Sequence, residues 1–243
     1  MKPVMIMDVP VHPVINTKMY EQLNEMMVGP GVKSIMTPNP EMVMLAQENK
    51  ELMSALRASD LVIPDGIGLI IASKIRNIGL RERVTGIDTM AKVLRICHEK
   101  QKSIFLLGGK PGRAEKATKN ILNQYPGITS AGYYHGYFSE AENDKIVDMI
   151  NQQHPEVVFV CLGSPRQEVW IHMNRDRINC KIAMGAGGSV DVYAGEVKRA
   201  PVVFQKIGLE WLYRLIQEPA RLKRMSVLPL FLWKSLWMIG RAR

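Results

Sequence analysis

Short apolar runs alternate along most of this chain with longer segments in which apolar residues recur at helical spacing. Short apolar runs are typical of strands buried on both faces, and the helical segments between them are typical of the crossovers of a parallel sheet. The sequence therefore predicts an α/β fold. The predicted strands are Lys33–Met36, Leu61–Pro64, Ser103–Leu107, Glu156–Leu162 and Lys181–Met184.

Helix start signals follow several of these strands. Asn39 and Pro40 supply an N-cap and a first-turn proline, Asp88 is expected to cap Thr89–Lys100, and Ser139 is expected to cap Glu140–Gln153. With the strands, they predict a Rossmann-like, mainly parallel sheet flanked by helices.

The carboxyl-terminal region has a different character. Residues 200–217 carry apolar residues at helical spacing, Pro219 interrupts, and residues 225–239 form an apolar stretch with tryptophans and Lys234. That stretch is shorter than the roughly 20 apolar residues that cross a bilayer, so we expect it to lie on a membrane surface. An ordinary core or dimer-interface helix is the alternative. We expect residues 1–195 to form the α/β core and residues 196–243 a helical, basic appendage.

Charge is concentrated in the same region. The formal net charge is +9, and eight basic against two acidic residues from Lys206 onward place +6 of it in the last 38 residues. Nucleic acid, anionic lipid and diphosphate groups all remain possible partners on charge alone. Three scattered cysteines and an amino terminus without a secretory signal favour a reducing, cytoplasmic location.

The residues that directly follow the strands are candidates for chemistry, because ligands of open parallel sheets bind beyond the carboxyl ends of the strands. Thr37 and Asn39 follow the first predicted strand, and for Asn39 capping and ligand binding are equally good explanations. Asp65 follows the second strand and is the candidate catalytic base, although a turn aspartate is the common use of Asp-Gly.

Three glycine-rich loops complete this edge. Gly108 and Gly109 belong to a strand-to-helix turn suited to an anion, yet the turn is neither a P-loop nor a GxGxxG fingerprint. Residues 162–168, with Gln167, offer polar side chains to a uracil edge or a sugar hydroxyl. Residues 185–188 and Asp191 form a comparable loop one strand later.

Taken together, these segments resemble the bacterial WecG/TagA/CpsF glycosyltransferase family, with the TagA branch the nearer one. The ordered motifs that carry the resemblance are Thr37–Pro40, Pro64–Gly68, Arg83–Gly86, Phe105–Gly109, Leu162–Glu168 with Trp170, Gly185–Gly188 with Asp191, Arg199–Pro201, and Gly208–Arg214 through Glu218 and Pro219 to Arg221 and Arg224.

The resemblance implies transfer of N-acetylmannosamine from UDP-ManNAc to undecaprenyl-diphosphate-linked GlcNAc in the synthesis of the wall teichoic acid linkage unit. A related branch uses the uronic acid form of the donor. The candidate catalytic residues are Asp65 and Thr37. The implied substrate-binding residues are Asn39, Arg83, Gly108, Gly109, Gln167, Asp191, Arg214, Arg221 and Arg224.

The leaving UDP needs a metal ion or fixed positive groups. The sequence contains no Asp-x-Asp motif, so we expect a metal-independent enzyme without a cofactor, in which Arg83, Arg214, Arg221 and Arg224 neutralise the diphosphate. Our hypothesis is that the tail docks on the inner face of the plasma membrane and closes over the cleft. Such a tail also allows self-association.

Two other classes of function are weaker. The first is a soluble nucleotide-dependent oxidoreductase, but the chain lacks the GxGxxG motif of such enzymes. That function also gives no reason for the tryptophans, lysines and arginines of the tail. A nucleic-acid-binding module would use the tail cations, but apolar residues such as Phe231 and Trp233 beside them favour lipid or a protein interface.

Overall fold

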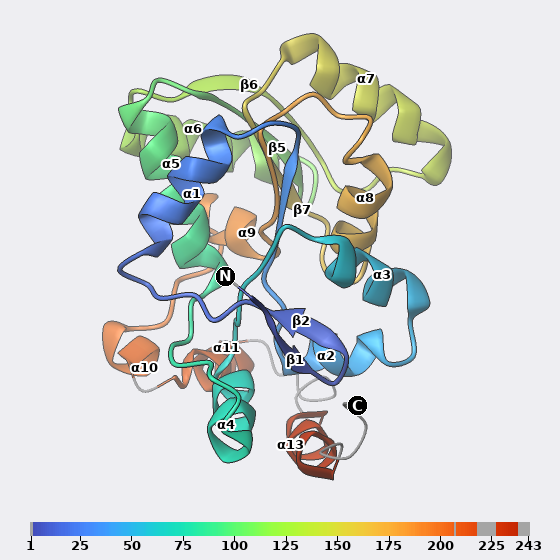
Figure 1. Ribbon diagram of the computed structural model, residues 1–243. Coiled ribbons are helices and arrows are strands. Elements are labelled where there is room, and N and C mark those ends of the chain that lie inside the picture. Colours follow the sequence, from blue (N-terminus) through green and yellow to red (C-terminus); the bar gives the residue numbers. More distant parts are fainter. Residues whose placement is uncertain (1, 207, 218–226, 238–243) are drawn as a thin grey trace.

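The structure, a computed structural model, describes residues 2–206, 208–217 and 227–237 and is built around one parallel sheet (Figure 1). Its strand order is β4-β3-β8-β7-β5-β6, and every neighbouring pair is parallel. The bounds are β3 Lys33–Met36, β4 Leu61–Val62, β5 Ser103–Gly108, β6 Thr129–Tyr134, β7 Val157–Cys161 and β8 Ile182–Gly185. All five predicted strands are confirmed, and the four longer ones are almost wholly buried.

Two strand features were not predicted. The edge strand β6 alternates between exposed, half-buried and buried residues and contains Gly132, so it lacks a continuous apolar run. An antiparallel hairpin, β1 Val4–Ile6 and β2 Val9–Val11, lies outside the main sheet. Its strands are too short to show a period.

Helices cover both faces of the sheet (Figure 1). The sheet therefore separates two hydrophobic cores, one on each face. One face packs against α1 Met19–Val28, α5 Gly86–Glu99, α6 Arg113–Gln124 and α9 Ser189–Tyr193. The other packs against α2 Pro40–Ala46, α3 Lys50–Ala58, α4 Ile67–Arg76, α7 Asn143–Gln153 and α8 Arg166–Asn174, together with the β1–β2 hairpin. The predicted α/β architecture is confirmed.

The predicted helix starts are confirmed in part. Asn39 caps α2, since its Oδ1 accepts a hydrogen bond from Met42 N at 2.9 Å. Ser139 forms a capping box, but with a short 3-10 helix, Glu140–Glu142, that precedes α7. The prediction for Asp88 is wrong: Thr85 caps α5, and Asp88 accepts a hydrogen bond from the Thr85 hydroxyl at 2.6 Å.

The carboxyl-terminal region contributes α10 Val202–Lys206, α11 Glu210–Gln217 and α13 Val227–Trp237. Helix α13 packs against α2 and α4. Phe231 and Ser235 are fully buried there, whereas Leu230 and Trp233 are exposed. Pro229 lies in the first turn, where a helix tolerates proline, so it does not break the helix. Among the described residues, no helix has the length and apolar character needed to cross a bilayer.

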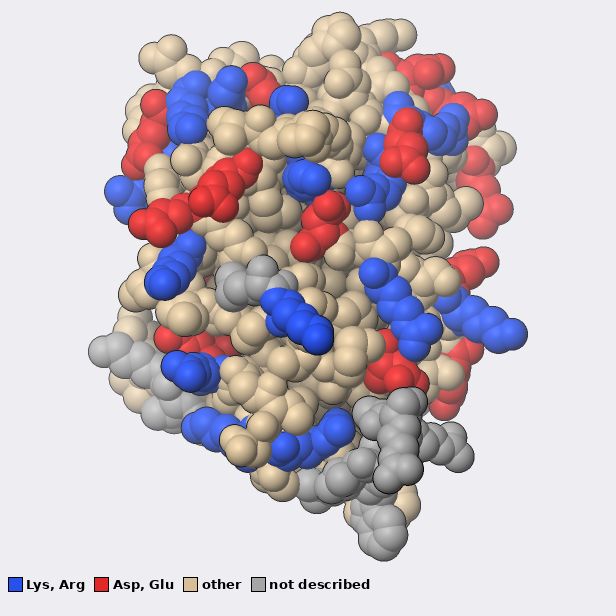
Figure 2. Space-filling view, in the orientation of Figure 1, with Lys and Arg blue, Asp and Glu red and all other residues tan. Residues whose placement is uncertain are grey.

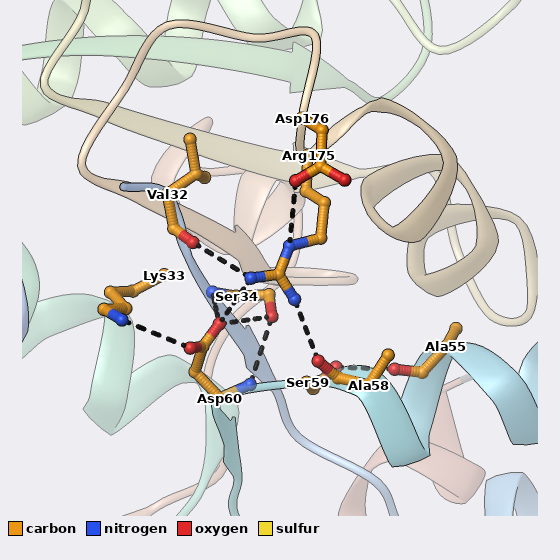
Figure 3. A network of polar contacts seen from close by, with 9 residues as sticks. All are labelled: Val32, Lys33, Ser34, Ala55, Ala58, Ser59, Asp60, Arg175 and Asp176. Carbon is orange, nitrogen blue, oxygen red and sulfur yellow. Dashed lines mark hydrogen bonds and ion pairs between the residues drawn. The ribbon is translucent and has the colours of Figure 1, made fainter. Parts of the chain in front are cut away.

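A network around Asp60 fixes the amino edge of the sheet (Figure 3). Its carboxylate accepts hydrogen bonds from Ser34 N at 2.9 Å and Ser34 Oγ at 3.0 Å, and it pairs with Arg175 at 3.3 Å and Lys33 at 3.5 Å. Arg175 also donates to the carbonyl of Ala58 at the end of α3. Strand β3, helix α3 and the end of helix α8 are thereby joined at the edge opposite the loops that carry the candidate site.

Candidate active site

A cavity of about 820 Å³ lies at the carboxyl edge of the sheet. Its wall is formed by the residues that follow β3, β4, β5, β7 and β8, as expected for an open parallel sheet. Among the residues predicted from sequence, those that line it are Thr37, Asn39, Asp65, Arg83, Gly109, Gln167 and Asp191. Folding thus brings residues from six separate segments of the chain to one cavity.

Asp65 and Thr37 flank one point of this wall. Asp65 Oδ2 accepts a hydrogen bond from the backbone N–H of Gly86 at 3.0 Å. A Cβ atom added to Gly86 would lie 3.0 Å from Thr37 Oγ1 and 3.5 Å from Asp65 Oδ2. Because Gly86 is the first residue of α5, the carboxylate also meets the positive end of that helix. A carboxylate oriented beside a hydroxyl in a cavity can accept a proton from a bound alcohol.

Asn39 caps a helix and also faces the cavity. Its Oδ1 is used as the cap of α2, while the residue also lines the cavity. Its amide nitrogen therefore remains as the group that can donate to a ligand.

The Gly108–Gly109 turn differs from its prediction. Gly108 has φ 138°, and an added Cβ would lie 2.2 Å from the Cys161 carbonyl oxygen, so close packing of β5 on β7 requires glycine there. The N–H of Gly109 donates to the same carbonyl at 3.1 Å. The backbone N–H of Gly109 is therefore engaged with the neighbouring strand β7.

Gln167 is buried in the cavity wall, where its side chain joins two loops by hydrogen bonds. Its Oε1 accepts from Gly187 N at 3.1 Å and its Nε2 donates to Glu168 Oε1 at 2.6 Å. Glu168 is fully buried, and burial raises the pKa of its carboxyl group. These two residues fix the loop after β8 to the start of α8. Gln167 therefore determines the position of the Gly187 loop in the cavity wall.

The predicted arginines have different positions. The Arg83 guanidinium pairs with Glu210 of α11 at 2.6 Å and donates to the Gln205 carbonyl at 3.1 Å. It lines the cavity but is anchored to the carboxyl-terminal region. Arg214 belongs to α11, whose backbone is described without that side chain; Arg221 and Arg224 lie outside the described residues.

Asp191 is paired as well. Its Oδ1 accepts from Arg113 at 2.7 Å, and Arg113 also lies 3.6 Å from Glu196. This ion pair joins the start of α6 to α9 at the cavity rim.

The sequence profile of the Glycosyl transferase WecG/TagA/CpsF family matches residues 4–243. The chain belongs to this family. Two relatives are named N-acetylglucosaminyldiphosphoundecaprenol N-acetyl-beta-D-mannosaminyltransferase. The one from Bacillus subtilis strain 168 is 38% identical over 195 residues, 80% of this chain and 75% of the relative. The one from Staphylococcus aureus strain MRSA252 is 34% identical over 200 residues, 82% of this chain and 78% of the relative.

Several charged residues that line the cavity of this glycosyltransferase were not among the predicted site residues. Lys110 and Arg113 follow β5, and Arg166 follows β7. Arg166 donates to the carbonyls of Gly136 and Phe138, both at 2.6 Å, and so holds the loop that presents Tyr137. The signal that could have found Lys110 and Arg113 is a pair of cations just after a glycine turn and before a helix.

The appendage of the transferase also reaches the cavity. Trp211 of α11 and Val227 and Leu228 of α13 line it. Within residues 2–206, 208–217 and 227–237, no group of three or more His, Cys, Asp or Glu side chains is arranged to hold a metal ion.

Proposed function

We propose that this protein transfers N-acetylmannosamine from UDP-ManNAc to undecaprenyl-diphosphate-linked GlcNAc, with inversion, as the wall teichoic acid linkage unit is made. The observation that carries the proposal is the Asp65 carboxylate beside Thr37 in a cavity at the carboxyl edge of the sheet, in a chain of this family. The names of the Bacillus and Staphylococcus relatives support the choice of donor and acceptor.

In the proposed step, the acceptor hydroxyl attacks the anomeric carbon of the donor sugar. A new glycosidic bond forms as the bond from that carbon to the UDP oxygen breaks, UDP leaves with the electron pair, and Asp65 takes the hydroxyl proton. The Gly86 N–H donates a hydrogen bond to one carboxylate oxygen and so fixes the orientation of the Asp65 side chain. Thr37, which lies at the same point of the wall, orients that alcohol.

Fixed cations neutralise the departing diphosphate in this proposal, so the reaction proceeds without a metal ion. Arg83 lines the cavity, and Lys110 and Arg113 add positive charge at the start of α6. Arg214, Arg221 and Arg224 are proposed to join them from the appendage. A guanidinium suits this role because it can bind two phosphate oxygens at once.

The acceptor carries a polyprenyl chain, so we further propose that the protein works at the inner, cytoplasmic face of the plasma membrane. The appendage is the proposed contact. Because α11 and α13 line the cavity and α13 also exposes Leu230 and Trp233, the same helices can meet lipid and complete the site. Alternatively, the exposed apolar residues of α13 are the contact through which two copies of the protein self-associate.

The test incubates purified full-length protein with UDP-ManNAc and a short-chain prenyl-diphosphate-GlcNAc, and follows both UDP release and disaccharide formation. Asp65→Asn should lower the rate by roughly 10²–10⁴-fold, the contribution of a positioned base. Asp176→Asn, whose side chain is 94% exposed at the far edge of the sheet, is the matched control and should retain the wild-type rate.

Addition of a chelator should leave the wild-type rate unchanged. A full rate for Asp65→Asn would remove Asp65 as the base, and transfer that requires added divalent metal would overturn neutralisation by cations. Replacing the donor with its uronic acid form should give no product; product with that donor alone would correct the donor assignment.

A further inference from the structure

Helix α4 has an apolar stripe on its exposed face. Leu69, Ile70 and Ala72 pack into the core, whereas Ile71 and Ile75 are 37% and 57% exposed. Residues four apart lie next to each other on a helix surface, so the two isoleucines form one patch. Isolated exposed isoleucines are common, but an adjoining pair on the outer face of a core helix requires an explanation.

The patch on α4 is continued by α13. Helix α13 packs against α4, and its Leu228 lies close to Gly68. On the outer side of α13, Leu230 is 44% and Trp233 56% exposed. Figure 1 shows α10 and α11 at the same end of the molecule, and they expose Val202, Val203 and Ile216. The exposed apolar residues of four helices thus gather at one end.

The same end is positively charged. Helix α4 contains Lys74 and Arg76, Arg81 follows it, and α13 contains Lys234; neither helix has an acidic residue. Figure 2 shows Lys and Arg side chains over the region of α4 at the lower end of the molecule. Apolar side chains interleaved with lysine, arginine and tryptophan fit the headgroup boundary of an anionic bilayer, because cations reach the headgroups while isoleucine enters the acyl region.

The location of the patch links it to the candidate active site. Ile67 and Gly68, at the start of α4, and Leu228, at the start of α13, line the cavity. The two helices therefore lead from the cavity wall to the exposed apolar surface. A bilayer resting on that surface would place a lipid-linked diphosphate beside the cavity mouth.

We propose that α4 is a docking surface for an anionic lipid bilayer, with Ile71 and Ile75 inserted at the headgroup boundary next to α13. This inference rests on the proposed function in one respect: the lipid-linked acceptor explains why such a surface adjoins the cavity. It assigns membrane contact to the α/β core as well as to the appendage.

The test is vesicle sedimentation of the full-length protein with phosphatidylcholine alone and with phosphatidylcholine mixed with phosphatidylglycerol. The double variant Ile71→Asp, Ile75→Asp should bind the anionic vesicles at least about tenfold more weakly than wild type, because two apolar side chains leave the bilayer. The matched control is Val28→Asp with Met173→Asp: both side chains are 70% exposed, and they lie in α1 and α8 near the opposite, amino edge. It should bind like wild type.

A second pair, Lys74→Gln and Arg76→Gln, should weaken binding to the mixed vesicles and not to phosphatidylcholine. If the aspartate pair lowers the thermal midpoint, Ile71→Ser with Ile75→Ser should give the same loss in a folded protein. Equal binding of the α4 variants and wild type would overturn the proposal. It would also fall if light scattering showed that wild type self-associates through α4 while vesicle binding is unaffected by the variants.

Transfer to the short-chain acceptor without vesicles separates the two proposals. The α4 variants should retain the wild-type rate there, since Ile71 and Ile75 do not line the cavity. Absence of transfer by wild type, with binding that still depends on α4, would reject the proposed reaction and leave the docking surface in place.

Discussion

The backbone N–H of Gly86 donates a hydrogen bond to Asp65 Oδ2 at 3.0 Å, so the first residue of α5 orients the candidate base. The two residues are 21 positions apart, and both line the cavity. Gly86 has no side chain to separate Asp65 from Thr37, and this bears directly on the first prediction.

Gly86→Ala should lower transfer while the protein stays folded. The new Cβ would lie 3.0 Å from Thr37 Oγ1 and 3.5 Å from Asp65 Oδ2, so the hydroxyl must shift. Small displacements of reacting groups cost about tenfold to a hundredfold in rate. Alanine is favourable in a helix, so the thermal midpoint should not fall. Gly29→Ala, which meets nothing closer than 3.5 Å, is the control; an unchanged rate for Gly86→Ala would mean that Thr37 does not act at this point.

The Arg83–Glu210 pair should tie the appendage helices to the core. Both side chains are largely buried, at 14% and 11% exposure, and Arg199 lies 3.6 Å from the same carboxylate. Glu210→Gln should cost about 2 kcal/mol, between an exposed and a fully buried ion pair, and lower the thermal midpoint by roughly 4–8 °C.

Limited proteolysis within residues 200–217 should also become faster in Glu210→Gln, because local opening is easier. The control is Glu115→Gln, which removes an exposed pair with Lys119 within α6 and should leave the midpoint unchanged. Equal midpoints for wild type and Glu210→Gln would show that packing alone holds the appendage helices in place.

Glu168 should make the protein less stable at high pH. Burial raises its pKa above the ordinary value of 4.5, so the folded state keeps a proton that the unfolded state loses. Its contribution is present below pH 4.5 and is lost as the pH rises toward the raised pKa. In Glu168→Gln this fall in the free energy of unfolding should be absent, as urea unfolding at several pH values would measure. A parallel decline in both proteins would refute a buried, protonated Glu168.

Asp60 should have the opposite pH dependence. Burial alone would raise its pKa, but hydrogen bonds from Ser34 and the charges of Arg175 and Lys33 outweigh burial and lower the pKa below 3.8. Its contribution is therefore present above pH 3.8 and is lost as the pH falls below that value. Asp60→Asn should cost about 1–2 kcal/mol at neutral pH, the scale of hydrogen bonds to a charged group.

The difference between Asp60→Asn and wild type should disappear in acid, whereas the rate of transfer should be the same for both proteins. The reason for the second expectation is position: the Asp60 network lies at the amino edge, away from the cavity (Figure 3). A loss of transfer in the folded variant would contradict this separation.

The sequence predicted the four inner strands and the buried edge strand β4 because strands buried on both faces must be apolar along their whole length. The same reasoning missed β6, since an edge strand with a half-exposed face has no such run. The sequence also predicted Asp88 as the N-cap of α5, whereas Thr85 is the N-cap. Both residue types cap helices well, and the sequence alone does not show at which of the two positions the helix begins.

By itself the sequence determined that Thr37, Asp65 and Asp191 lie at the same edge, since the residues after parallel strands converge at the carboxyl edge of the sheet. Only the tertiary structure decided which side chains of the site are already engaged: Arg83 pairs with Glu210, 127 positions away, and Asp191 pairs with Arg113. Such pairings depend on side-chain distances between remote segments. Those distances are set by the packing of helices on the sheet and leave no periodic pattern in the chain.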